Sequence, residues 1–291
     1  MSERGRQSFR KIRPIHLSIF LVLLAAGSLR GQEQTPPAAI SGPQMTLGIS
    51  PLRAELKIAP GVNTSQSVRI SNTGLVNTQI RATIQDWTLS TSGEQRFLKP
   101  GAGTWGCASW LKVNPTEFSL APGAVELIRY TMAVPSSSSE GGYHCAIVFD
   151  TLPPPKEQLA QMGTGVVNLV RMVTTLYATV GNPPIVAKIK RLEMSPRKSG
   201  KKTSFVIVTE FVNEGTTQYR VEGSVDLIDP DGKPVKKFEY KSFPVLPGVP
   251  REATFTLDEP LPAGQYLLRA VIDVGAKERL AAETRVNVTG G

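Results

Sequence analysis

Residues 165–180 constrain the fold of this chain more than any other stretch. They are rich in β-branched and apolar side chains, carry a single charge and contain no internal Gly or Pro, a composition that predicts a long β-strand. Successive side chains of a strand point to opposite faces, and here both faces are apolar. One face carries Val166, Val170, Met172, Leu176 and Val180, and the other carries Val167, Leu169, Val173 and Tyr177, with Arg171 among them.

Two interpretations of this strand remain open. A strand that is apolar on both faces is normally buried on both, which predicts an interior strand of a sandwich. Alternatively, it is an edge strand at a domain junction, whose spare apolar face and unpaired backbone bind another chain. The first interpretation gives the strand a structural role, and the second gives it a binding function.

The N-terminus has the layout of a secretory signal peptide. A basic region with Arg4, Arg10 and Lys11 precedes an apolar run over 15–26, and small residues follow. We assign residues 1–31 to the signal peptide, and a permanent signal anchor is the alternative. Residues 1–30 carry a net charge of +5 out of the total of +9, so the mature chain is too weakly basic to predict a nucleic-acid binder.

The two cysteines, Cys107 and Cys145, predict one disulfide in an exported chain, and two buried thiols are the alternative. His144 is the only histidine after the leader, and strand geometry would direct it away from Cys145. The sequence shows neither a phosphate-binding Gly loop nor the clustered Cys and His of a zinc site. We therefore expect a protein that is not an enzyme and has no cofactor or metal.

The mature chain is predicted to be all-β, with two immunoglobulin-like β-sandwich domains in tandem after the signal peptide. Residues 32–44 form a flexible leader, and residues 45–183 hold about seven short strands separated by turn signals. Pro51 predicts an edge strand or a bend where a strand changes sheet. Residues 90–106 are predicted to be a loop, and residues 156–162 are the one short helix candidate. The second, smaller sandwich spans 184–291, with a hairpin at 229–232.

The first domain resembles the N-terminal domain of PapD-like periplasmic pilus chaperones over roughly residues 47–183. The matching pattern is Val113-Asn114-Pro115, then Phe118, Leu120 and Pro122-Gly123, then a strand with Leu127, Ile128 and Arg129. Arg53, residues 68–72 and residues 143–155 match in addition. The resemblance implies a periplasmic chaperone whose last first-domain strand completes the sheet of an unfinished subunit.

The same resemblance implies which residues bind the subunit. The alternating side chains of the donor strand are Val167, Leu169, Arg171, Val173 and Tyr177. Arg53 stands where the family has one member of a basic pair that grips the subunit's C-terminal carboxylate. The family's lysine on the donor strand is absent, since Arg171 is the only cation between residues 165 and 183. The implied partners are a pilus or surface-fibre subunit and an outer-membrane usher.

The second domain is more similar to immunoglobulin-like domains of surface-attached bacterial proteins that bind cell-wall-associated partners. Residues 213–215, 229–232, 246–248 and 261–266 carry this likeness. It supports an alternative function, that of a structural or adhesive cell-surface protein with two binding domains. The leading hypothesis remains a periplasmic chaperone that caps incomplete subunits by donating an edge strand.

Overall fold

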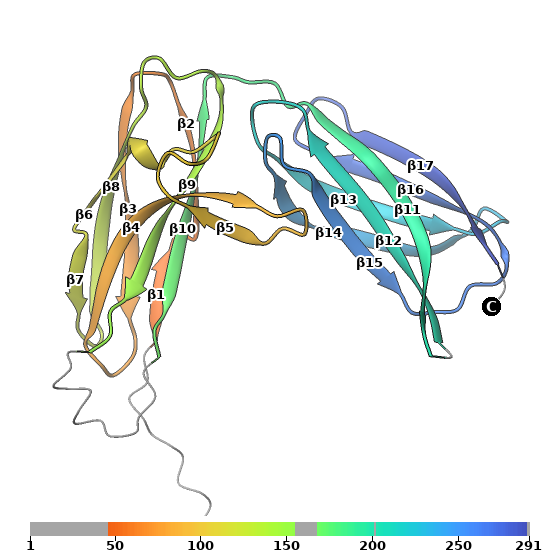
Figure 1. Ribbon diagram of the computed structural model, residues 1–291, viewed down its shortest axis with the longest axis horizontal. Helices are drawn as coiled ribbons and strands as arrows, with labels where there is room; N and C mark the ends of the chain where they lie inside the picture. The colour runs from red at the N-terminus through yellow and green to blue at the C-terminus, as the bar shows by residue number, and fades with distance from the viewer. Residues whose placement is uncertain (1–45, 155–167, 201, 290–291) are drawn as a thin grey trace, which may run out of the picture. The chain divides into compact units, whose positions relative to one another are not determined.

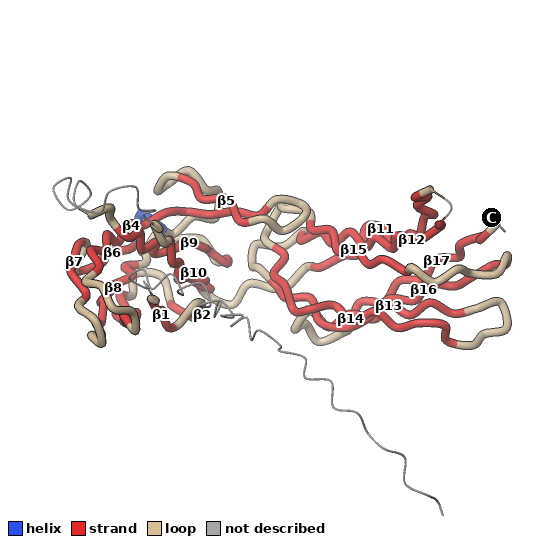
Figure 2. The backbone as a smooth tube through the Cα atoms, turned by 90° about the horizontal axis from the view of Figure 1, so that it is seen from below, coloured by secondary structure: helices blue, strands red, loops and turns tan. Residues whose placement is uncertain are grey.

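The computed structural model describes residues 46–154, 168–200 and 202–289 (Figure 1). Within these ranges the regular structure is β-strand apart from one short 3-10 helix, which confirms the predicted all-β fold (Figure 2). No helix among these residues is long and apolar enough to cross a membrane. The signal peptide, the leader, the helix candidate at 156–162 and Val167 lie outside the described residues.

The first sandwich is built from two sheets. The first sheet, called sheet A below, has the strand order β1 (Leu47–Ser50), β3 (Asn63–Asn72), β8 (Val125–Ala133), β6 (Leu111–Asn114). The second, sheet B, has the order β2 (Arg53–Ile58), β10 (Arg171–Val180), β9 (Gly141–Thr151), β4 (Thr78–Leu89), β5 (Gln95–Leu98), and β7 (Glu117–Leu120) also pairs with β4.

The core of this sandwich lies between the two sheets. Alternate residues of β3 and β8 point into it, among them Ile70, Ile128 and Tyr130, and they are at most 1% exposed. Phe149 of β9 and Leu176 of β10 meet them from sheet B and are fully buried. The period-two pattern of the sequence therefore becomes the inner face of each sheet.

The chain passes from one sheet to the other at Pro51. β1 pairs antiparallel with β3 in sheet A, whereas β2 pairs parallel with β10 in sheet B. Thr174 Oγ1 donates to the carbonyl of Pro51 at 2.9 Å, and Thr175 N–H donates to the carbonyl of Leu52 at 3.0 Å. The prediction of a bend at Pro51 is confirmed, and the bend decides which part of β10 is covered by β2.

The prediction that residues 90–106 form only a loop is wrong, because β5 lies within them. Ser90 N–H donates to the Glu94 carbonyl, and this turn folds Gln95–Leu98 back onto β4. A four-residue strand with two polar members has too little alternation to be recognised from sequence. A 3-10 helix, η1 (Ala108–Trp110), follows shortly after this segment.

The second sandwich has a three-stranded and a four-stranded sheet. The first has the order β11 (Ala187–Ser199), β12 (Lys202–Asn213), β15 (Arg251–Leu257). The second has the order β14 (Pro234–Val245), β13 (Tyr219–Ile228), β16 (Gly264–Asp273), β17 (Leu280–Val288). The predicted hairpin at 229–232 is confirmed, since Gly232 N–H donates to the Asp229 carbonyl at 3.0 Å and β13 pairs with β14.

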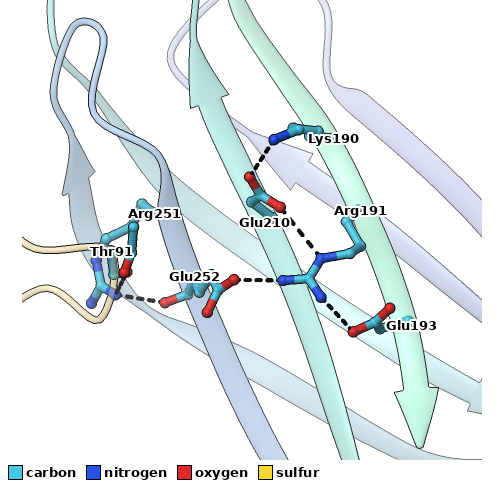
Figure 3. Close-up of polar contacts among 7 residues, drawn as sticks. All are labelled: Thr91, Lys190, Arg191, Glu193, Glu210, Arg251 and Glu252. Atoms are coloured by element: carbon cyan, nitrogen blue, oxygen red, sulfur yellow. Dashed lines mark hydrogen bonds and ion pairs between the residues drawn. The ribbon is translucent and has the colours of Figure 1, made fainter.

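A network of charged side chains crosses the three-stranded sheet (Figure 3). The Arg191 guanidinium contacts the carboxylates of Glu193 at 2.6 Å, Glu210 at 3.3 Å and Glu252 at 2.5 Å. Lys190 binds the other oxygen of Glu210 at 2.9 Å. These ion pairs join β11, β12 and β15 on one face of the sheet.

Candidate functional site

The candidate site is the edge of β10 that faces away from β9. β10 pairs with β9 along its whole length, from Arg171 opposite Asp150 to Val180 opposite Gly141. Its parallel pairing with β2 begins only at Thr175, which lies opposite Arg53. Within the described parts of the chain, residues 171–174 therefore have a strand partner on one side only.

The hydrogen bonds around this stretch show which backbone groups face the open edge. Thr151 N–H donates to the carbonyl of Val170 at 3.0 Å, and Val170 N–H donates to Thr151 Oγ1 at 2.8 Å, so even-numbered residues are directed toward β9. Thr175 N–H is directed instead toward Leu52 on the opposite side. Because the direction alternates along a strand, Arg171 and Val173 present their N–H and C=O groups at the open edge.

The side chains of β10 separate into two faces as predicted. Met172, Thr174 and Leu176 point into the core and are buried. On the other face, Arg171 is exposed and Val173 is half-buried. Leu169, just before the strand, is 59% exposed. An unpaired backbone edge thus lies beside accessible apolar side chains, which are the two features that an added strand requires.

Tyr177 is placed differently from the other predicted binding residues, because the residue is only 6% exposed. It packs edge-to-face on Trp87 with 5.4 Å between ring centroids, in an apolar cluster that includes Val148 and Leu246. Burial raises the pKa of Tyr177 to about 12, although the nearby positive charges of Arg220 and Arg53 act in the opposite direction. A ring covered in this way is not accessible to a partner.

The charge of Arg171 is already neutralised. Its Nε and Nη2 atoms donate to the two carboxylate oxygens of Asp150 at 2.6 Å and 3.1 Å, in a bidentate pair across β9 and β10. The hydrogen bonds to Asp150 and its charge raise the pKa of Arg171. The pair holds the start of β10 against β9 and leaves the opposite edge free.

Arg53, the first residue of β2, lies directly beyond the open stretch. Its Nε atom is 3.2 Å from Glu55 Oε1, and the two side chains are 46% and 60% exposed. A surface ion pair of this kind is weak and exchanges readily with another carboxylate. The structure therefore brings together Arg53, Leu169, Arg171 and Val173 around one edge, while Tyr177 is buried and Val167 lies outside the described residues.

The predicted disulfide between Cys107 and Cys145 is present, with 5.1 Å between the Cα atoms. It fastens the segment after β5 to β9 on the core side of sheet B. His144 lies on the opposite face, as predicted, where its ring is 5.0 Å from that of Trp87. Burial lowers the pKa of His144 to about 4, with the charge of Asp86 acting in the opposite direction.

Sequence analysis missed two acidic residues that shape this region. Asp150 pairs with Arg171, and the fully buried Asp86 accepts hydrogen bonds from the backbone of residues 101–108. The position of Asp150 on β9 follows from strand register alone, which sequence does not give. Asp86 had a recognisable signal, since a carboxylate at an inward position of a strand must find buried donors.

Comparisons with known proteins identify similar folds. The sequence matches no family model and no curated protein. Similar solved structures include the class 5 fimbriae chaperone CfaA (15% identity, TM-score 0.46, covering 82% of this chain and 98% of that one). A second is the CsuC–CsuE chaperone–tip adhesion subunit complex of Acinetobacter baumannii, with 14% identity and a TM-score of 0.42, covering 82% of this chain and 97% of that one. A third is the E. coli chaperone DraB, with 16% identity and a TM-score of 0.39, covering 82% of this chain and 99% of that one. At these identities and TM-scores the similarity carries no conclusion about the function of this chain.

Proposed function

We propose that this chain is a periplasmic chaperone of pilus or surface-fibre assembly, which binds an unfinished subunit along the open edge of β10. The observation that carries the proposal is the uncovered stretch at residues 171–174. An incomplete immunoglobulin-like subunit exposes the groove of a missing strand. Pairing of that groove with β10 would satisfy backbone groups on both chains and bury the apolar side chains beside them.

The two exposed apolar positions have separate roles in this proposal. Leu169 is mostly exposed, so it loses water only when a client covers it, whereas Val173 is half-buried already. Complete burial of an exposed leucine contributes about 1.5–3 kcal/mol. Leu169 is therefore expected to contribute more affinity than Val173, and the backbone of Arg171 and Val173 is expected to set the register of the client strand.

Arg53 would bind an acidic group at the end of the added strand. It stands opposite Thr175, one residue beyond the open stretch, and its present partner Glu55 is well exposed. A client carboxylate could replace Glu55 as the hydrogen-bond acceptor, and this charge-assisted contact would fix the client's orientation. Arg220, whose charge acts on Tyr177 together with that of Arg53, is a candidate for a second cation.

The test is co-purification of the tagged full-length chain from the periplasm, with mass spectrometry of the proteins that accompany it. Wild type is expected to recover a small fibre subunit. Leu169→Glu and Val173→Glu are expected to lose it, because a charge on the paired edge cannot be desolvated without a counter-charge. Leu75→Glu and Val235→Glu are the matched controls, since both residues are exposed aliphatics far from β10 in sequence (76% and 43%).

A second variant tests backbone pairing itself. Val173→Pro removes an N–H group that points to the open edge and leaves the hydrogen bonds to β9 in place. It is expected to abolish subunit binding while near-ultraviolet circular dichroism remains native. Retention of the subunit by folded Leu169→Glu and Val173→Pro would refute the proposal. Recovery of wall polymer and mature surface proteins instead would favour the adhesive alternative.

A further inference from the structure

The outer face of sheet A carries cations and no carboxylate. This face is formed by the residues of β1, β3, β8 and β6 that alternate with core positions, since Val68, Ile70, Ile128 and Tyr130 point inward. Its members, read from strand register, are Gly48, Ser50, Ser65, Ser67, Arg69, Ser71, Val125, Leu127, Arg129, Thr131, Lys112 and Asn114. We call this surface the outer face of sheet A.

The three cations of this face stand on one diagonal. Arg69 of β3 lies opposite Leu127, and Arg129 follows two residues later on β8. Lys112 of β6 lies opposite Thr131, two residues beyond Arg129. Each step therefore advances one strand and two residues, which corresponds to about 8 Å between neighbouring Cα atoms. Same-side residues of an extended peptide repeat at about 7 Å, so the two spacings are close.

Three of the six other described cations of the first sandwich have an acidic partner, and the cations of the diagonal have none. Arg53, Arg81 and Arg171 each form an ion pair with a carboxylate of the same sheet. Among the described residues, Arg69, Arg129 and Lys112 are exposed and have no carboxylate within ion-pair distance. The nearby hydroxyl groups of Ser65 and Thr131 bond to each other at 2.7 Å and carry no charge.

An exposed aliphatic residue lies between two of these cations. Leu127 is 62% exposed and stands directly opposite Arg69, two residues from Arg129, and its neighbour Val125 is 42% exposed. Guanidinium groups favour bidentate hydrogen bonds to carboxylates. The leucine beside them stabilises a complex only if an apolar group of the partner covers it. The complementary surface is an extended segment with acidic side chains at alternate positions and an apolar residue beside them.

From this arrangement we propose that the outer face of sheet A binds an extended acidic segment of a partner protein along the diagonal Arg69–Arg129–Lys112. The site is on the other sheet from the open edge of β10, so the proposal does not rest on the chaperone function. Three exposed ion pairs and one apolar contact give weak, salt-sensitive binding. Such binding suits a transient partner.

The probe is a fluorescein-labelled twelve-residue peptide with Glu at every second position, and its Gln counterpart is the charge control. Fluorescence anisotropy with the full chain is measured at 50 mM and 300 mM NaCl. The Glu peptide is expected to bind at low salt and the Gln peptide is not. A peptide with the same number of Glu residues in one block is expected to bind at least about threefold more weakly, because it does not match the diagonal.

The variant Arg69→Gln/Arg129→Gln/Lys112→Gln is expected to weaken binding at least about tenfold. The matched control is Lys57→Gln/Arg96→Gln/Lys99→Gln, which removes three other exposed cations of the first sandwich that have no ion pair among the described residues and is expected to change the affinity less than twofold. If both triple variants weaken binding equally, net charge alone explains the binding and the proposal is overturned. Binding to vesicles of phosphatidylcholine and phosphatidylglycerol in place of the peptide would also overturn it, as would no binding of the Glu peptide at all.

Discussion

The buried carboxylate of Asp86 accepts a hydrogen bond from the backbone N–H of Ala108 at 2.9 Å. Its other oxygen accepts from Gly101 N–H at 2.7 Å and from Gly103 N–H at 3.3 Å. One side chain of β4 thus holds three backbone donors of the segment that carries Cys107. The contact places this half of the disulfide opposite Cys145.

Replacement of Asp86 is expected to destabilise the first sandwich strongly. In Asp86→Asn one acceptor oxygen becomes a donor, and at least one buried N–H loses its partner. Hydrogen bonds to a charged group contribute about 1.5–3 kcal/mol each, so the free energy of unfolding should fall by at least that amount. Urea denaturation measures it. Glu117→Gln, which removes an exposed ion pair with Arg81, is the control and should cost about 1 kcal/mol or less.

Gly106→Ala should be destabilising for a related reason. A Cβ atom at this position would overlap the carboxylate of Asp86, which the three backbone hydrogen bonds hold in place. Gly101→Ala tests the reverse: its Cβ would meet nothing within 4 Å, and the only cost is its positive φ of 81°. We expect the thermal midpoint to fall further for Gly106→Ala, and equal midpoints would contradict a rigid carboxylate.

Removal of the disulfide should lower stability without changing the fold. Cys107 and Cys145 are 38 residues apart, and a cross-link over such a loop typically contributes about 2–4 kcal/mol. Cys107→Ala/Cys145→Ala should therefore unfold at a lower urea concentration and show a native far-ultraviolet spectrum. An unchanged midpoint would mean that Asp86 alone orders the segment.

His144 should make the free energy of unfolding depend on pH. Its pKa is lowered to about 4 in the folded chain, while the unfolded chain titrates near 6.5, so the unfolded chain binds more protons between these values. The free energy of unfolding should therefore fall as the pH is lowered from about 6.5 to about 4, by up to about 3 kcal/mol. His144→Leu should lose this part of the pH dependence, and parallel curves for both proteins would contradict it.

The Arg191 network predicts a salt-sensitive contribution in the second sandwich. Arg191→Ala leaves Glu252 and Glu193 without their cation, and Glu210, whose side chain is 12% exposed, keeps only Lys190. We expect the free energy of unfolding to fall at low salt, and to fall by less at 1 M NaCl, because salt screens exposed ion pairs. Arg191→Lys should restore little of it, because one ammonium group cannot reach three carboxylates at once. Arg269→Ala, which breaks one exposed pair with Glu283, should have a smaller effect.

Sequence alone predicted the elements whose signals are local. The two-faced pattern over 171–180, the hairpin at 229–232, the bend at Pro51 and the disulfide are all present. β5 was missed because its four residues carry too little alternation, and its pairing with β4 is what makes it a strand. The regular strand also begins at Arg171, later than predicted.

The candidate site was harder to predict from sequence than the fold, because more of it depends on contacts between residues far apart in the chain. Alternation correctly assigned Leu169, Arg171 and Val173 to one side of the strand. It could not show that Trp87, ninety positions earlier, covers Tyr177, or that Asp150 neutralises Arg171. Sequence also could not show that β2 begins opposite Thr175, because the register between strands far apart in the chain is set only when the sheet assembles.

The sheet change at Pro51 fixes where β2 begins to pair with β10. β2 can pair with β10 only after the chain has left sheet A, so the position of this crossing sets how many residues of β10 remain uncovered. A crossing two residues earlier would cover Val173, and one two residues later would expose Thr175. Insertions or deletions on either side of Pro51 would therefore lengthen or shorten the uncovered stretch of β10 without altering a single residue of that strand.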